Sequence, residues 1–338
     1  MRKTIWLLAS CAALSGCGGG NSSSGPVVVS SAPTPTPSTP TPTPASGTLS
    51  TGEVKPGAGA TFIAASMELN TTGGVSETNG IITGGMTNSR STTIDTPMFS
   101  GSYSAQTGYH LSDAVNAMTF GPGQLTFDTT VHNGNGTVLF TNTAGTVEDY
   151  LALYQATTYT SSSKGSGFTT AQYGGSGGWQ HTVVNGSSRH TRLDYFAYGT
   201  ATPVGAMPHS GVVKFTMLAT GNYATDTDLW FLPSTTSNFL TVDFAAGTVS
   251  GTLGLGGQNF YKNQTGGIGS LPLAGNLSGN AATGSFLASL DTSSSVAGKF
   301  HLVFVGPNAN EVIITYVAND GSQAAVGAAV GVVDPYIF

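Results

Sequence analysis

The sequence predicts an all-β protein, first from its composition and then from the spacing of its apolar residues. Charged residues make up only 8% of the 338 residues and glycine occurs 48 times, which favours short strands joined by turns over helices rich in Glu, Lys and Leu. Between residues 240 and 255 apolar and polar side chains alternate, with Leu240, Val242 and Phe244 on one side. Successive side chains of a strand point to opposite faces, so this pattern predicts two half-buried strands that meet near Gly247.

Eight strands are expected after residue 205, and eight is the number at which a closed barrel is filled by its own side chains. They fall at about 210–219, 239–245, 248–255, 271–278, 283–290, 297–305, 311–318 and 323–332. In the last strand, four alternate positions carry only Ala or Gly, namely Ala325, Gly327, Ala329 and Gly331. A face with so little bulk predicts close approach by another chain segment or domain. Residues 206–338 are therefore expected to form a soluble, eight-stranded antiparallel β-barrel.

A β-rich handle domain is expected ahead of the barrel, over residues 47–205. Short runs of β-branched and aromatic residues alternate there with glycine and asparagine turns, as at 60–65 and 136–140. The segment from Val147 to Ala156 is the one place where a short helix is expected.

The first 17 residues have the features of a bacterial lipoprotein signal peptide. Arg2 and Lys3 supply a positive start, and the apolar core at 4–14 is too short to span a bilayer as a stable helix. The core ends in Leu-Ser-Gly-Cys at 14–17, which matches the lipobox that signal peptidase II cuts before the cysteine. Cys17 is therefore expected to carry lipid, and two or more acyl chains anchor stably because each buried methylene contributes roughly 0.8 kcal/mol. An ordinary secretion signal is the alternative, but it leaves the cysteine at the cleavage point unexplained.

Residues 18–46 are expected to be a tether that holds the folded part away from the membrane. A Gly/Ser-rich start is followed by Pro/Thr alternation from Pro33 to Pro44, which favours polyproline II and spans roughly 37 Å at about 3.1 Å per residue. Gly18 follows the expected lipid site, so no Asp is present there to signal retention in the inner membrane. These features predict a lipid-anchored protein of the outer membrane, at the cell surface.

The cysteine and charge content excludes several classes of function. Cys11 and Cys17 are the only cysteines, so the mature part is expected to have no disulfide, thiol nucleophile or thiolate metal site. Without Arg2 and Lys3, 8 basic residues remain against 16 acidic ones. This sparse negative charge argues against a nucleic-acid partner.

Three stretches together resemble a known family. The alternating run at 240–253 is followed by Phe-Val-Gly-Pro-Asn-Ala-Asn-Glu-Val at 304–312 and by Gly-Ser-Gln-Ala-Ala-Val-Gly-Ala at 321–328. In this order and spacing they resemble the C-terminal β-barrel of transferrin-binding-protein-B-like surface lipoproteins, over roughly residues 210–333. The run Tyr-Phe-Ala-Tyr-Gly at 195–199 is similar to the segment that leads into the barrel in that family.

The chain departs from the family pattern at two places. Val305 stands where the family usually has Tyr, and Ile313-Ile314 stand where it has a Gly pair. These differences weaken the transfer of any particular ligand. The resemblance implies a lipoprotein that takes iron or haem from a carrier protein such as transferrin or haemoglobin and works with a TonB-dependent outer-membrane transporter.

A transmembrane barrel is the main alternative for the fold. The terminal Tyr336-Ile337-Phe338 is similar to the end of outer-membrane barrels, but a lipid-facing wall requires an apolar outer face. Here Thr, Ser, Asp and Lys occupy the positions opposite the hydrophobic ones, and Asp334-Pro335 interrupt the last strand. A lipid anchor would also be redundant.

No enzymatic or metal-binding motif is convincing in the sequence. Gly174–Gly178 formally matches Gly-x-Ser-x-Gly, but that pattern has meaning only between a strand and a helix of an α/β sheet. Asp226-x-Asp228 lacks the further oxygen ligands of a calcium loop. The six histidines, His110, His132, His181, His190, His209 and His301, show no short ligand spacing. His301 is interpreted as an exposed strand residue, and the Arg189-His190-Arg192 cluster as a solvated strand end. The prediction is a protein that is not an enzyme and has no cofactor or metal site.

The candidate ligand contacts are four aromatic residues in two barrel loops. The first loop carries Trp230 and Phe231, and the third carries Phe260 and Tyr261. Aromatic residues exposed on the loops of a rigid scaffold are common anchors of protein recognition, although the rings could equally close the barrel mouth or pack on the handle. The expected function is capture of a protein or a metal- or haem-carrying solute at the cell surface for nutrient uptake. A structural or adhesive surface lipoprotein without a solute ligand is the alternative.

Overall fold

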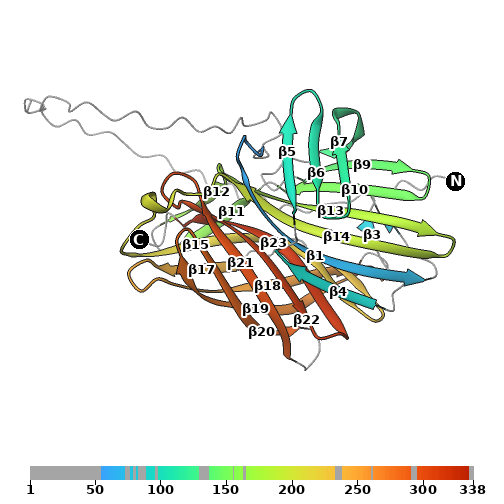
Figure 1. Ribbon diagram of the computed structural model, residues 1–338. Helices are drawn as coiled ribbons and strands as arrows, with labels where there is room; N and C mark the ends of the chain where they lie inside the picture. The colour runs from blue at the N-terminus through green and yellow to red at the C-terminus, as the bar shows by residue number, and fades with distance from the viewer. Residues whose placement is uncertain are drawn as a thin grey trace, which may run out of the picture. The chain divides into compact units, whose positions relative to one another are not determined.

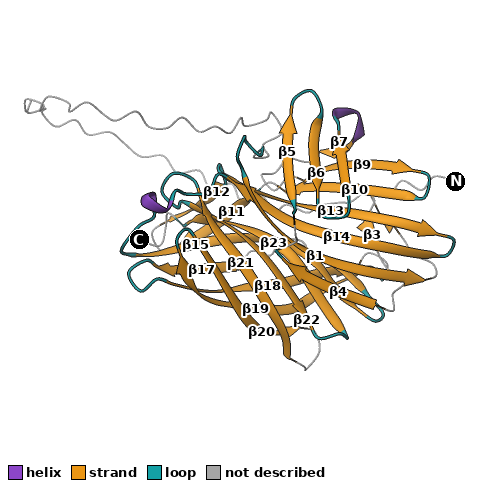
Figure 2. Cartoon of the chain, viewed as in Figure 1, coloured by secondary structure: helices purple, strands orange, loops and turns teal. Residues whose placement is uncertain are grey.

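Strands dominate the computed structural model, as the sequence predicts (Figures 1 and 2). The structure describes residues 55–72, 77–78, 81–82, 89–95, 98–128, 137–154, 156–162, 165–232, 238–259, 262–290 and 295–334. Within these ranges the only helical elements are two short 3₁₀ turns, η1 (Pro122–Gln124) and η2 (Val204–Ala206). No helix among the described residues is long and apolar enough to cross a bilayer.

A seven-stranded antiparallel sheet, here called the handle sheet, is built before residue 200. In spatial order its strands are β4 (Ser89–Ile94), β1 (Thr61–Thr72), β14 (Ser188–Gly199), β13 (Gly174–Asn185), β10 (Val147–Tyr154), β9 (Thr137–Ala144) and β8 (Leu125–Asp128). The helix expected at 147–156 is wrong, because β10 pairs with β9 on one edge and with β13 on the other. Pairing on both edges outweighs the weak local preference of this segment for a helix.

Three smaller sheets accompany the handle sheet. Strands β5 (Ser100–Ser104), β6 (Gly108–Ser112) and β7 (Ala117–Phe120) form a three-stranded sheet, called here the cover sheet. Strands β11 (Thr157–Ser162) and β12 (Gly165–Thr170) form one pair, and β2 (Glu77–Thr78) and β3 (Ile81–Ile82) form another. Buried Tyr109, Leu111 and Phe120 of the cover sheet pack with Trp179 and Phe196, so this sheet covers part of one face of the handle sheet.

The rest of the described chain forms the barrel that the alternation predicts. Its strands are β15 (Val212–Thr225), β16 (Leu229–Leu232), β17 (Asn238–Asp243), β18 (Thr248–Asn259), β19 (Gln264–Ser278), β20 (Ala281–Leu290), β21 (Ser295–Val305), β22 (Glu311–Asn319) and β23 (Gln323–Val333). Each strand runs antiparallel to its neighbours, and β15 pairs with β23 to close the ring. The short β16 and β17 share one edge of β15, β16 along residues 221–224 and β17 along 212–217. They therefore occupy one strand position together, and the eight-stranded closed barrel is confirmed.

The barrel interior is filled by apolar side chains from every side. Phe215, Leu240, Phe300, Phe304 and Tyr316 are all at most 2% exposed and belong to one cluster. The outward face of β20 and β21 is mostly polar, with exposed Ser and Thr and with Lys299. An outer-membrane barrel turns an apolar band to lipid instead.

The other face of the handle sheet packs onto the outside of the barrel wall at β22 and β23. Handle residues such as Met67 and Leu193 are buried in one cluster with Ile313, Val326 and Val330 of the barrel. Because β22 and β23 have the barrel core on one side and the handle sheet on the other, nearly all of their residues are buried.

The small face of the last strand is approached closely by another chain segment, one of the two neighbours that the sequence suggests. Ala325 and Ala329 lie in the barrel core, whereas Val326 and Val330 on the opposite face meet the handle. A Cβ atom on Gly327 would lie 2.3 Å from the Tyr316 hydroxyl oxygen of the paired strand. The absent bulk therefore makes room for a tyrosine ring inside the barrel, and it is not the docking face of a domain.

Glu311 joins the barrel to the handle sheet. This carboxylate is 5% exposed and accepts backbone N–H bonds from Gln172 at 2.7 Å, Tyr173 at 3.0 Å and Gly174 at 2.8 Å. Burial raises the pKa of Glu311, and the three N–H donors oppose that rise. Glu311 lies in the run at 304–312 that carries the family resemblance, so the structure gives this part of the motif an architectural role.

Candidate functional site

Of the four predicted aromatic contacts, only Trp230 and Phe231 are among the described residues, and they lie at one end of the barrel. Trp230 and Phe231 lie in the short strand β16 rather than in a loop, opposite Tyr223 and Asn222 of β15. Phe231 also pairs with Gln258 near the end of β18. Phe260 and Tyr261 lie outside the described residues, as does the expected lipid site Cys17.

Asp228, the residue before β16, contacts two residues near the predicted third loop. Its carboxylate accepts a hydrogen bond from the Asn259 side chain at 2.8 Å, and its Oδ1 atom lies 2.6 Å from Lys262 Nζ. Burial would raise the pKa of Asp228, but hydrogen bonds from Lys262, Thr227 and Asn259 outweigh it and lower the pKa. Asn259 and Lys262 flank the other two aromatic residues in the sequence. The structure therefore brings the bases of the first and third loops together, and Asp228 is part of this ion pair.

Trp230 and Phe231 are both partly buried, and they face different parts of the molecule. Trp230 packs against the barrel core, whereas Phe231 packs against the cluster between the barrel and the handle sheet. The Trp230 carbonyl accepts a hydrogen bond from Asn222 at 3.1 Å, and Asn222 accepts one from the Tyr195 hydroxyl of the handle sheet at 2.5 Å. Each ring therefore supports the scaffold while part of it stays accessible.

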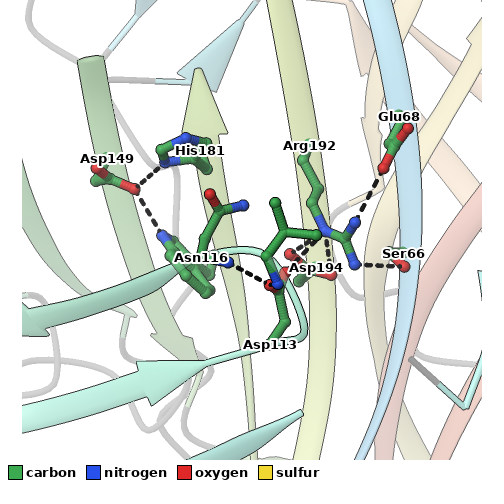
Figure 3. Close-up of polar contacts among 10 residues, drawn as sticks. Ser66, Glu68, Asp113, Asn116, Asp149, His181, Arg192 and Asp194 are labelled. Atoms are coloured by element: carbon green, nitrogen blue, oxygen red, sulfur yellow. Dashed lines mark hydrogen bonds and ion pairs between the residues drawn. The ribbon is translucent and has the colours of Figure 1, made fainter. Parts of the chain in front are cut away.

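A second polar arrangement lies on the handle-sheet face that bears the cover sheet (Figure 3). Arg192 is its centre: Nε lies 3.0 Å from Asp194 Oδ2 and 2.9 Å from Asp113 Oδ2, and Nη1 donates to Glu68 at 2.9 Å. Asp113 comes from the turn between β6 and β7, where its Oδ1 accepts the backbone N–H groups of Val115 and Asn116 at 2.6 Å each. Arg192 thus ties the cover sheet to β14 and β1.

Three carboxylates around one guanidinium make this cluster sensitive to protonation. Burial raises the pKa of Asp194 to about 7, with Arg192 opposing the rise and Asp113 and Glu68 adding to it. The pKa of Arg192 is raised, because the attraction of Asp194, Asp113 and Glu68 outweighs the lowering caused by burial. The cluster therefore carries surplus negative charge whenever all three acids are ionised.

Asp149 of β10 and His181 of β13 lie next to the Arg192 cluster, on the two strands that follow β14 in the sheet. Asp149 Oδ1 accepts bonds from the Trp179 indole N–H at 2.9 Å and from His181 Nδ1 at 2.8 Å. Asp149 pairs with His181, and His181 pairs with Arg192, on neighbouring strands. Residues 149, 181 and 192 show no motif in the sequence, and only the strand register brings them into line.

Three other histidines also lie on strands and contact oxygen atoms, whereas His209 lies in a bend. His110 meets Thr119 Oγ1 at 3.0 Å, His190 meets Asn70 Oδ1 at 2.8 Å, and His301 meets Asp95 Oδ1 at 2.5 Å. The His301 side chain is 23% exposed rather than fully exposed. Among the described residues, no group of three or more His, Cys, Asp and Glu side chains could hold a metal ion.

A surface groove of about 690 Å³ lies between the handle sheet and the barrel. Thr92, Thr93 and Ile94 of the edge strand β4 line one side, and residues of β20, β21 and β22 line the other. Neither Trp230 nor Phe231 lines this groove.

The fold is a closed antiparallel barrel with an antiparallel sheet packed on its outer wall, and the solved structures similar to the chain include the haemoglobin receptor HpuA and transferrin binding protein B. No protein-family model matches the chain, and no match was found among curated proteins. HpuA from Kingella denitrificans in complex with human haemoglobin is 15% identical, with a TM-score of 0.41 over 88% of this chain and 92% of that one.

Transferrin binding protein B from two further organisms is also similar. The Haemophilus parasuis protein is 12% identical, with a TM-score of 0.38 over 82% of this chain and 77% of that one. The Neisseria meningitidis protein is 11% identical, with a TM-score of 0.35 over 81% and 77%. At such low identity and TM-score, the ligands of those proteins cannot be assigned to this chain.

Proposed function

We propose that the chain is a non-enzymatic lipoprotein of the outer-membrane surface that captures a protein, or a metal- or haem-carrying solute, for nutrient uptake of the iron type. The observation that carries the proposal is the Asp228–Lys262 ion pair, which joins the residue before β16, the strand of Trp230 and Phe231, to the residue that follows Phe260 and Tyr261 in the sequence. Aromatic side chains on a rigid barrel suit a recognition surface. The signal and lipobox at Cys17, followed by the Pro/Thr tether, would place the barrel in the surrounding medium. Delivery would then need a transporter, and a TonB-dependent outer-membrane receptor is the partner expected.

The binding test uses the full chain in detergent, immobilised and offered haem, haemoglobin or transferrin separately. Alanine at each of the four aromatic positions should weaken capture, because a true anchor contributes about 2 kcal/mol or more, roughly 30-fold in Kd. Phe239→Ala is the matched control, since Phe239 is 37% exposed on β17 and lies outside the two turns. Circular dichroism must show an intact fold in each variant. Unchanged capture in all four variants would contradict the proposed site.

The anchor is tested separately, by feeding cells an alkyne fatty acid. The wild-type chain should take up the label and Cys17→Ser should not, because the thiol is the expected attachment atom. Equal labelling of the two chains would contradict the lipid anchor while leaving the binding site open to its own test.

A further inference from the structure

Two histidines lie close together on the open part of the handle sheet. His181 of β13 pairs with Arg192, and His190 of β14 pairs with Val183. Paired residues share a face, as do residues two apart on one strand, so His181 and His190 are diagonal neighbours on the same face. Diagonal neighbours are rooted about 7–8 Å apart, within reach of long side chains. This part of the face is open to solvent, because His190 is exposed and Val183 is 37% exposed.

Both imidazole rings are oriented by an oxygen acceptor on an outer strand. His181 Nδ1 lies 2.8 Å from Asp149 Oδ1 on β10, and His190 Nδ1 lies 2.8 Å from Asn70 Oδ1 on β1. A carboxylate or amide oxygen only accepts, so each Nδ1 carries the proton and each neutral ring keeps its lone pair on Nε2. The strand order is β1-β14-β13-β10. Each Nδ1 is thus held on the side away from the other histidine, and the free lone pair of each ring is on Nε2.

We propose that His181 and His190 form a site for one divalent transition-metal ion of the imidazole-preferring kind, Cu²⁺, Ni²⁺ or Zn²⁺. A histidine that donates its second ring N–H to a carboxylate or carbonyl is the usual form of a metal ligand, because that contact fixes the tautomer and raises the basicity of the ring. Imidazole nitrogens bind such ions at about 2.0–2.1 Å. Two protein ligands leave coordination positions open for water or for a group on an arriving solute.

The surrounding charge favours a cation at this place. Asp149 is fully buried, and its Oδ2 atom has no hydrogen-bond partner among the described residues. Glu68 is 42% exposed beside Arg192, whose guanidinium is already engaged by Asp113 and Asp194. This proposal goes beyond the proposed function, because the chain's own side chains would hold the ion whether or not a carrier protein is captured.

The test is titration of the full chain in detergent with Cu²⁺, Ni²⁺, Zn²⁺ and, as a negative control, Mg²⁺. His181→Ala and His190→Ala should each weaken the tightest site by more than the roughly 10–100-fold typical of losing an outer-shell partner. Asn70→Ala removes the contact that orients His190 but leaves both imidazole rings in place, so it should cost about 10-fold. Electron paramagnetic resonance of the bound Cu²⁺ should show two nitrogen ligands in the wild type and one in each histidine variant.

His301→Ala is the matched control. His301 has the same kind of contact with a carboxylate, Asp95, but its paired residues are Thr283 and Thr315 rather than a histidine. The His301→Ala variant should bind the metal as the wild type does. Wild-type affinity in both His181→Ala and His190→Ala would overturn the proposal, and so would a loss confined to one of them or an equal loss in His301→Ala. Thermal melts of each variant separate loss of the site from loss of the fold.

Discussion

Strands β20 and β22 belong to the same barrel, yet their outer faces meet different surroundings. Along β20 buried and exposed residues alternate, because the outer face meets water. Along β22 the first eight residues are all buried, because the outer face meets the handle sheet. The lesson is that an antiparallel strand loses its alternation where a second layer covers it. Apolar residues on both faces of 311–333 therefore mark the covered side of the wall.

The largest difference between the covered and the exposed outer face of the barrel is expected when a charge is placed on each. Val330→Asp puts a carboxylate at a fully buried position against the handle sheet. It should lower the free energy of unfolding by about 4–5 kcal/mol or more, at the upper end for single substitutions. Leu287→Asp on β20 is the control, because Leu287 is 67% exposed and should tolerate the charge. Urea denaturation of the two variants gives both values, and equal losses would show that the handle sheet does not cover β23.

Removing the Glu311 carboxylate tests the connection between the barrel and the handle sheet. Glu311→Ala leaves the backbone N–H groups of residues 172–174 without their acceptor. We expect a loss of about 3 kcal/mol, since hydrogen bonds to charged groups contribute about 1.5–3 kcal/mol each and are not additive. Glu148→Ala removes a carboxylate from the half-exposed pair with Arg189 and should cost about 1 kcal/mol or less. Hydrogen exchange at residues 172–174 should quicken in the first variant alone.

The inner face of β23 is tested by adding a single methyl group at Gly327. In Gly327→Ala the new Cβ would lie 2.3 Å from the Tyr316 hydroxyl oxygen and 2.2 Å from the Thr220 carbonyl oxygen. Overpacking of this kind costs about 1–3 kcal/mol. Gly267→Ala on β19 is the matched control, because its Cβ would meet no atom within 4 Å. A melting temperature that is unchanged in Gly327→Ala would mean that the ring of Tyr316 lies elsewhere.

The face of the handle sheet that bears the cover sheet has a pH dependence of its own, through Asp194. The folded-state pKa of Asp194 is raised to about 7, above its ordinary value of 3.8. Its contribution to stability is therefore fully present below the unfolded-state pKa and is lost as the pH rises through about 7. Asp194→Asn should flatten this change, which for a pKa raised from 3.8 to about 7 is on the order of 4 kcal/mol between pH 4 and 8. Urea midpoints measured across that range check it, and equal slopes for the two chains would contradict the assignment.

Local patterns predicted much of the barrel and little of the handle. Alternation at 240–255 follows directly from a wall with water on one side, so β17 and β18 could be read from the sequence. The β10 segment could not, because a strand in the middle of a sheet takes its conformation from its neighbours. The break between β16 and β17 was likewise hidden, and residues at 229–232 looked like a loop.

The candidate sites show the same limit more strongly. Aromatic residues near 230 and 260 are visible in the sequence as runs, but the contact of Asp228 with Asn259 was not predicted. His181, Arg192 and Asp149 come from three strands, and nothing in their spacing marks them. Their alignment depends on hairpin register, which a one-residue slip would reverse.

Closure of the barrel between its first and last strands sets the order of events during synthesis. Residues 215–225 pair with 323–333, so the ring cannot close until nearly the whole chain has been made. Contacts so distant in sequence also form slowly, because the loop entropy is lost before the pairing repays it. The handle sheet cannot bury its apolar face until β22 and β23 have been made, because these strands cover it. A chain with this topology therefore completes its fold only after its last strand has been made.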